Sequence, residues 1–263
     1  MFKHLVVGAA LALGAQSLVA ADATKEVKKT VALEKDGRVS VETYKGSLRV
    51  AGWDRPEVEV AARVESDDGC GDSKYQAEMV RDTEIRIEGG GSSLSIESDY
   101  SRVKDRHWGF FFGSCSSRPF VRYTISMPKT ARLEIKDYKS EISLNDLGAE
   151  IRLNTYKGEV RAAGLAGPMR LDTYKGDVRM GFTRVSGDMR FETYKGEIEL
   201  TLPRDARFSV AADVSGRGSL DSDFPVLLKT GSRSRAHIEA SANGGGPELS
   251  LHTYRGTFKL RSS

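Results

Sequence analysis

The chain of 263 residues carries 40 Lys and Arg against 37 Asp and Glu, so its formal net charge is only +3. A nucleic-acid-binding domain would concentrate positive charge, and we therefore expect no nucleic acid among the partners. Charges of both signs at this density predict a well-solvated surface. The length suits one elongated domain or two small ones.

Residues 1–21 have the layout of a secretory signal peptide. Lys3 precedes an apolar stretch from Leu5 to Leu13, and small residues lead to a cleavage position after Ala21. The alternative is a membrane anchor, but this stretch is well short of the ~20 residues of a spanning helix, and no later segment is apolar enough to span. We expect the remaining chain, 22–263, to be exported, either periplasmic or secreted to the cell surface.

A four-residue motif, Thr-Tyr-Lys-Gly, recurs along the chain. Tyr138, Tyr156, Tyr174 and Tyr194 lie 18, 18 and 20 residues apart, and such a fixed period is typical of stacked repeats. The copies begin at Thr43, Thr155, Thr173 and Thr193, with an Arg variant that begins at Thr253 and a weaker copy, Asp137-Tyr138-Lys139-Ser140.

Apolar and polar residues alternate on both sides of each motif. Met169 and Leu171 precede one copy at one parity, Val178 and Met180 follow it, and charged residues occupy the other parity. This is the period of half-buried strands, joined here by a tight turn at the glycine. Stacked units of this kind share a continuous core, which a single unit cannot form.

The sequence therefore predicts an all-β fold, a parallel β-solenoid with rungs of 18–20 residues that spans 22–263 as one domain. The crossover rule for parallel strands favours a right-handed solenoid. Left-handed coils also have 18-residue turns, but the six-residue apolar repeat that marks them is not visible.

Residues 64–130 interrupt the period, and we expect an irregular insertion there. Asp72 can cap a short helix that runs to Arg81. A hairpin is expected around Gly89-Gly90-Gly91, and an alternating strand ends at Pro128.

An aromatic loop lies within this insertion. Trp108, Phe110, Phe111 and Phe112 are bounded by glycines and can form an exposed contact for a partner or a membrane surface. Alternatively, they form a plug over one end of the solenoid, because a solenoid needs capping where it stops.

The chain has two cysteines, Cys70 and Cys115, both in surroundings rich in Gly and Ser. An even number of cysteines in an exported protein predicts one disulfide. Two unlinked thiols are the alternative, since separation in sequence says nothing about distance in space.

Between Tyr194 and Tyr254 lie 60 residues, which is three periods of 20. Val214-Ser215-Gly216 occupies the place of the motif in the first of these periods. No motif is recognisable near Ser234, so we expect an irregular rung or a loop there.

The chain resembles the bacterial putative-adhesin family of exported β-solenoid domains, whose function is largely unassigned. The resemblance covers residues 37–261 and implies the fold rather than an activity. The Tyr-Lys pair departs from it, because such rungs more often carry small polar residues before the glycine. The matching motifs are Gly52-Trp53-Asp54, the strand Glu57–Val60, the rungs from Leu133 to Leu200, Ser222-Asp223-Phe224-Pro225 and Asn243-Gly244-Gly245-Gly246-Pro247.

The repeated Tyr-Lys pair is the first candidate binding site. If the rungs stack, the tyrosines form a ladder at the inter-strand spacing of about 4.8 Å, flanked by cations, which suits a glycan or an acidic polymer. In the alternative interpretation, the rings only stack on one another and the lysines point into water. The candidate residues are Tyr138, Tyr156, Lys157, Tyr174, Lys175, Tyr194 and Lys195.

Signals for catalysis are weak. His107, His237 and His252 are not at metal-ligand spacing, and neither a nucleophile elbow nor a phosphate loop is present, so we expect no metal and no cofactor.

We expect a non-catalytic binding protein of the cell envelope, whose partner is an envelope polysaccharide or protein. The alternative is a polysaccharide-acting enzyme, for which Asp172 and Glu192 are neighbouring carboxylates. A third possibility is a purely structural partner of an envelope protein.

Overall fold

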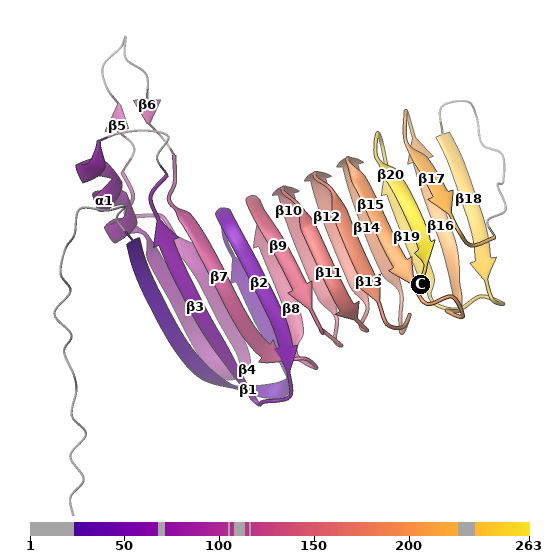
Figure 1. The fold of residues 1–263 in the computed structure, drawn as a ribbon, viewed down its shortest axis with the longest axis horizontal. Coiled ribbons are helices and arrows are strands. Elements are labelled where there is room, and N and C mark those ends of the chain that lie inside the picture. Colours follow the sequence, from indigo (N-terminus) through magenta and orange to yellow (C-terminus); the bar gives the residue numbers. More distant parts are fainter. Residues whose placement is uncertain (1–23, 68–71, 105, 108–113, 116, 226–234) are drawn as a thin grey trace, which may run out of the picture.

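The structure is a computed structural model that describes residues 24–67, 72–104, 106–107, 114–115, 117–225 and 235–263. Eighteen strands are hydrogen-bonded into one sheet that folds into two layers (Figure 1). The first layer is the one that contains the strands leading into the Tyr-Lys corners, and the second layer is the one that contains the strands following these corners. The fold is all-β and mostly parallel, as predicted, whereas its predicted handedness stays a prediction.

The first layer consists of nine strands, in which only β18 is antiparallel to its neighbour. Their order in space is β4 (Glu84–Asp99), β1 (Thr24–Glu42), β8 (Arg132–Asp137), β10 (Ile151–Lys157), β12 (Met169–Lys175), β14 (Met189–Lys195), β19 (Glu248–Thr253), β16 (Phe208–Ser215) and β18 (Arg235–Ala242).

The second layer begins with the first half of β1, which passes from one layer to the other. After it come β3 (Glu57–Glu65), β7 (Phe120–Pro128), β2 (Lys45–Trp53), β9 (Lys139–Asn145), β11 (Val160–Leu165), β13 (Val178–Phe182), β15 (Glu197–Leu202), β20 (Thr257–Ser262) and β17 (Ser219–Ser222).

The core lies between the two layers and follows the alternation of the sequence. Leu171 is fully buried in β12, whereas its neighbour Arg170 is exposed. Leu153 of β10 pairs with Leu171, and Leu171 pairs with Phe191 of β14, so each apolar residue rests on its equivalent one rung away. Burial of each such side chain stabilises the fold by about 1.5–3 kcal/mol.

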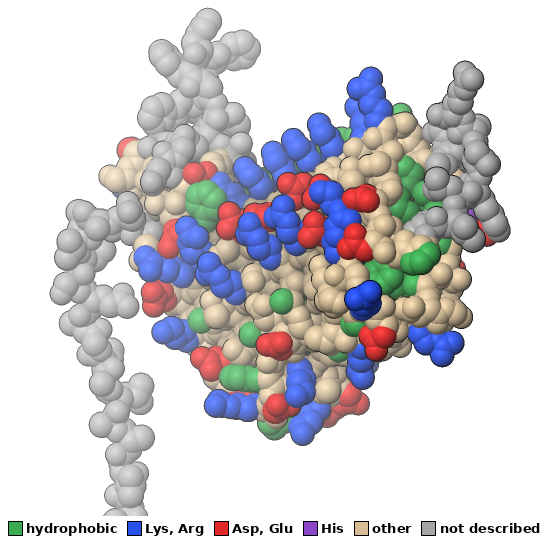
Figure 2. Space-filling view, turned by 45° about the vertical axis from the view of Figure 1, so that its right-hand side comes forward, with side chains coloured by type: hydrophobic (Ala, Val, Ile, Leu, Met, Phe, Trp, Pro, Cys, Tyr) green, Lys and Arg blue, Asp and Glu red, His purple; other side chains and the backbone are tan. Residues whose placement is uncertain are grey.

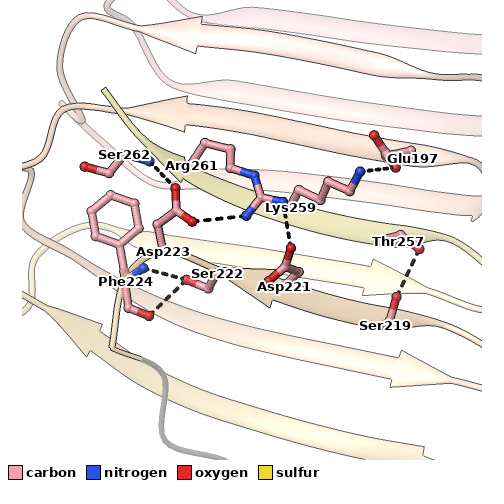
Figure 3. A network of polar contacts seen from close by, with 10 residues as sticks. All are labelled: Glu197, Ser219, Asp221, Ser222, Asp223, Phe224, Thr257, Lys259, Arg261 and Ser262. Atoms are coloured by element: carbon pink, nitrogen blue, oxygen red, sulfur yellow. Dashed lines mark hydrogen bonds and ion pairs between the residues drawn. The ribbon is translucent and has the colours of Figure 1, made fainter.

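The rungs do not stack in chain order. The last rung of the sequence, β19 with β20, lies between the rung of β14 and β15 and the rung of β16 and β17. Arg261 of β20 links the two rungs through ion pairs with Asp221 of β17, at 2.6 Å, and with Asp223 just after β17, at 3.2 Å (Figure 3). On the other side of β20, Lys259 forms an ion pair of 2.6 Å with Glu197 of β15.

The region 64–130 is more regular than its sequence suggests. The expected helix is α1 (Ser73–Asp82), and the Asp72 carboxylate accepts a hydrogen bond from the Tyr75 N–H. Instead of a hairpin at the three glycines, 84–99 form one strand, β4, which bends where Gly89, Gly90 and Gly91 have positive φ and pairs with β1 from Gly91 to Glu97. With β4 in the first layer and β7 in the second, this region extends both layers.

Several predicted features lie outside the described residues. These are the signal peptide, Cys70, and the aromatic residues Trp108, Phe110, Phe111 and Phe112, which fall between the short paired strands β5 (Arg106–His107) and β6 (Ser114–Cys115). The disulfide of Cys70 with Cys115 therefore stays a prediction. Within the described ranges, no helix is long and apolar enough to cross a membrane.

Candidate functional site

Six tyrosines form a continuous stack along one edge of the molecule. Adjacent ring centroids are 4.8, 5.0, 4.9, 4.9 and 5.3 Å apart, and the ring planes differ by 2–14°. Each side chain remains exposed, with 37–46% of its surface accessible. The stack, which we call the tyrosine ladder, runs in the order Tyr44, Tyr138, Tyr156, Tyr174, Tyr194 and Tyr254.

The glycine of each motif lets the corners pack closely. A Cβ added to Gly176 would overlap the carbonyl oxygen of Gly158, and one added to Gly196 would overlap that of Gly176. Gly196 also has a φ of +127°, which favours glycine. The close approach of successive corners therefore places the tyrosines one strand spacing apart.

The side chain of the first residue of the motif accepts hydrogen bonds from the backbone of the same corner. Thr253 Oγ1 accepts a hydrogen bond of 2.7 Å from the Gly256 N–H. In the weaker copy, Asp137 Oδ2 accepts one of 3.0 Å from the Ser140 N–H and one of 2.7 Å from the Thr155 hydroxyl. Burial raises the pKa of Asp137, and these hydrogen bonds only partly oppose the rise.

A row of cations follows the tyrosine ladder along the corners. Lys157 pairs in register with Lys175, and Lys175 with Lys195. Figure 2 shows Lys and Arg side chains in a row along the upper edge of the molecule. The row, which we call the cation row, consists of Lys139, Lys157, Lys175, Lys195 and Arg255.

Lys45 occupies the equivalent place at the N-terminal end but is buried. Its ammonium group forms a 2.5 Å ion pair with Asp67 and lies 4.2 Å from the centre of the Phe120 ring. By contrast, Lys139, Lys157, Lys175 and Lys195 are exposed, and none of them forms an ion pair with a described residue.

The opposite flank of the tyrosine ladder is a shallow groove of about 540 Å³. One wall is formed by Tyr156, Tyr174, Tyr194 and Tyr254. The other wall is a row of residues on the outward parity of the first layer, in which each residue pairs with the next: Asn154, Asp172, Glu192, His252 and Asp213.

Two carboxyl groups of the groove are neighbours, because Asp172 of β12 pairs in register with Glu192 of β14. Burial, together with the hydrogen bond to Glu192, raises the pKa of Asp172. Burial also raises the pKa of Glu192, but hydrogen bonds from Arg190 and Asp172 outweigh this and leave it below its usual value.

Two histidines contact the carboxylate of Asp213, which lines the groove. His237 Nδ1 lies 2.9 Å from Asp213 Oδ1, and His252 Nδ1 lies 3.4 Å from Asp213 Oδ2. Hydrogen bonds to Asp213 and then to Glu239 raise the pKa of His237. Among the residues that the structure describes, no group of three His, Cys, Asp or Glu side chains is arranged to hold a metal ion.

The sequence placed Tyr138, Tyr156, Tyr174 and Tyr194 in one ladder, and their rings do stack. Tyr44 and Tyr254 were not assigned to it, although the motif itself was a sufficient signal. The approach of Asp213 to His252 had no such signal, since it depends on the order in which the rungs stack.

Two solved structures illustrate what this chain is similar to. A putative cell adhesion protein from Clostridium sporogenes has a TM-score of 0.50 at 13% identity, with 91% of this chain and all of that chain covered. A putative adhesin from Bacteroides fragilis gives a TM-score of 0.45 at 14% identity, with 90% of this chain and 97% of that chain covered.

No curated protein matches the chain at a significant level. A family model does match, over residues 30–261, which is most of the chain, and it describes the Toastrack domain DUF4097. The chain therefore belongs to the Toastrack DUF4097 family.

Proposed function

We propose that the protein is an exported, non-catalytic binding module that holds an extended polymer of the cell envelope, either a glycan or an acidic polymer. The binding surface, which we call the Tyr–Lys face, consists of the tyrosine ladder and the cation row. Export rests on the layout of residues 1–21, and the family and the fold set a scaffold without assigning an activity.

One observation carries this proposal: the six stacked tyrosines stay 37–46% exposed beside a row of lysines that form no ion pair with any described residue. Folding requires the corner glycine and the inward apolar residues, but it does not require a Tyr and a Lys on every corner. Val214 and Ser215 take these places beside Gly216 in the β16–β17 rung. The face extends over six rungs, so it suits a long ligand better than a small molecule.

A polysaccharide-cleaving enzyme is the alternative, and Asp172 with Glu192 is its best carboxyl pair. Glycoside hydrolysis needs two carboxyl groups about 5–9.5 Å apart, on either side of the bond that is cleaved. Asp172 and Glu192 instead lie side by side on adjacent strands, on the same wall of the groove, and not on either side of a bound sugar chain. The geometry of this pair favours binding.

An array of envelope polysaccharides and acidic polymers tests the proposal, with the wild-type chain and a triple variant, Tyr156→Ser, Tyr174→Ser and Tyr194→Ser. We expect the wild type to retain at least one polymer without shortening it, and the triple variant to lose that binding. Each aromatic pair contributes only about 0.5–1.5 kcal/mol, so the variant should keep the circular dichroism of a β protein.

A second triple variant, with Phe at the same three positions, is the matched control because it keeps the stacked rings. If the Ser variant no longer melts cooperatively and the wild type binds no polymer, the tyrosine ladder is a structural device and the proposal fails. Release of shortened chains from a bound polymer would favour the enzyme instead.

A further inference from the structure

The ring faces of the tyrosine ladder are covered. Each interior ring has a parallel ring on both sides, with centroids 4.8–5.3 Å apart. At one end Tyr100 packs edge-on against Tyr44, and at the other the Arg255 guanidinium lies 5.5 Å from the centre of the Tyr254 ring. A sugar ring or a nucleobase that stacks on tyrosine needs an open face. The ladder instead offers its ring edges.

The phenol hydroxyls lie on these edges, and in the described chain none of the six has a hydrogen-bond partner. A phenol donates one hydrogen bond, and a donor bonds an anionic oxygen more strongly than a neutral one. The exposed edges are thus suited to acidic groups.

The acidic side chains that follow the corners form no ion pair with the cation row among the described residues. Glu159 contacts Arg161 at 2.5 Å and Arg179 at 3.4 Å, Glu197 contacts Lys259 at 2.6 Å, and Asp177 accepts a hydrogen bond from the Glu197 N–H. The cation row therefore keeps its positive charge. Its members are about one strand spacing apart, ~4.8 Å, which is well within the screening length of about 8–10 Å, so their fields add.

We infer that the ligand of the Tyr–Lys face is a linear acidic polysaccharide that lies parallel to the stacking axis, with one anionic group beside each rung. This inference rests on the proposed function and specifies the ligand class of the same face. A sugar ring advances an extended chain by a length similar to the rung spacing, so carboxylates carried on successive rings can meet successive lysines.

The groove on the other flank confines such a ligand to the corner side. The described lining of this groove has three acidic residues, Asp172, Glu192 and Asp213, and no Lys or Arg, so it is less suited to a polyanion than the cation row. A single-stranded nucleic acid is disfavoured for a different reason, because its bases gain affinity by stacking on open aromatic faces. The ligand is therefore held by charge and by hydroxyl groups rather than by stacking.

The probe is a set of galacturonic acid oligomers, a trimer and a hexamer, together with a neutral hexamer in which the carboxyl groups are reduced to alcohols. One variant combines Lys157→Gln, Lys175→Gln and Lys195→Gln. The control variant combines Lys28→Gln, Lys35→Gln and Lys74→Gln, which removes the same charge from exposed positions outside the cation row. Calorimetric titration at several salt concentrations gives the affinities.

We expect the acidic hexamer to bind at least ~10-fold more tightly than the trimer, because it neutralises more lysines. The variant of the cation row should lose about 10-fold or more in affinity, with a shallower dependence on salt, while the control triple keeps the wild-type affinity. Both triples should melt at the wild-type temperature.

Equal binding of the neutral hexamer, unchanged in the variant of the cation row, would overturn this inference while the proposed function stood. Tighter binding of an oligothymidylate than of the acidic hexamer would overturn it in favour of a nucleic acid. If no polymer binds the wild type here or on the array, the proposed function falls as well.

Discussion

Asp137 is a buried acid that should make the stability of the protein depend on pH. It is 8% exposed, and its Oδ1 is buried without a hydrogen-bond partner. Burial raises the pKa of this carboxyl in the folded state, so folding favours its protonated form. The stabilisation is fully present below the unfolded pKa, near 3.9, and it is lost as the pH rises through the folded pKa.

Asp137→Asn should therefore gain stability relative to the wild type as the pH is raised from about 3.5 to 7. Urea unfolding at several pH values measures this difference. Asp36→Asn is the matched control, because Asp36 is exposed and its removal should shift both ends of the range alike. Parallel profiles for Asp137→Asn and the wild type would show that the carboxyl is ionised as easily in the fold as in the unfolded chain.

The corner glycine Gly176 and the strand glycine Gly181 differ in the space around them. An added Cβ at Gly176 would overlap the Gly158 carbonyl, whereas at Gly181 the nearest atoms are 3.8 and 4.0 Å away. Neither residue has a positive φ. The two positions thus separate close packing from backbone conformation.

We expect Gly176→Ala to destabilise the fold by about 1–3 kcal/mol, because the neighbouring rung must move. Gly181→Ala should be neutral or stabilising by about 0.4–1 kcal/mol, because it restricts only the unfolded chain. Thermal melts compare the two variants. Equal melting temperatures would mean that the corners are looser than the stacked carbonyls indicate.

At the scale of the strand, the inward and outward residues should tolerate charge very differently. Leu171 is fully buried between Leu153 and Phe191, so Leu171→Asp loses its packing and buries an unpaired carboxylate, at a cost of about 4 kcal/mol or more. Arg170→Asp, on the exposed side of the same strand, should change stability by only about 0.5 kcal/mol. Chemical denaturation of both variants measures the contrast, and similar losses would contradict the observed register.

Strand positions and faces could be predicted because they follow from local alternation. Leu153, Leu171 and Phe191 share one parity relative to their motifs, and hydrophobic burial leaves one way to orient them. The region of β4 could not be predicted in the same way. Its glycines indicate a turn, and φ is indeed positive at Gly89, Gly90 and Gly91, but the chain continues from them as a strand that pairs with β1 from Gly91 to Glu97. The local signal gives the bend, whereas pairing with a strand that is distant in sequence decides where the chain runs next.

At the scale of the whole molecule, the stacking order of the rungs could not be predicted from the sequence. The rungs with the motif offer similar inward apolar residues and the same corner, so the motif does not encode which rung packs on which. The interval from Tyr194 to Tyr254 suggested intermediate rungs between them. Instead the two rings are in direct contact, with centroids 5.3 Å apart. The continuous tyrosine ladder depends on this exchange of order, because the β16–β17 rung carries no tyrosine at its corner.

The exchanged order predicts an unusual response to deletion of residues 248–263. Leu249 of β19 pairs with Met189 on one side and with Val210 on the other, so the deleted rung is internal to the stack. Without this rung, β16 should lose the parallel strand with which it pairs, and the apolar residues of β14 and β15 should become exposed. We expect hydrogen exchange to show loss of protection from β14 to β18, while β8 to β13 stay protected because their contacts are intact.

A point variant separates this effect from the loss of chain length. Leu251→Asp keeps all residues but buries a carboxylate in the same rung, and it should deprotect the same strands, whereas Ser250→Asp on the outward side should not. If the rungs were stacked in chain order, the deletion would remove only an end, and β16 and β17 would remain as protected as in the full chain. Retained protection of β16 would therefore contradict the observed order and, with it, the contact of Tyr194 with Tyr254.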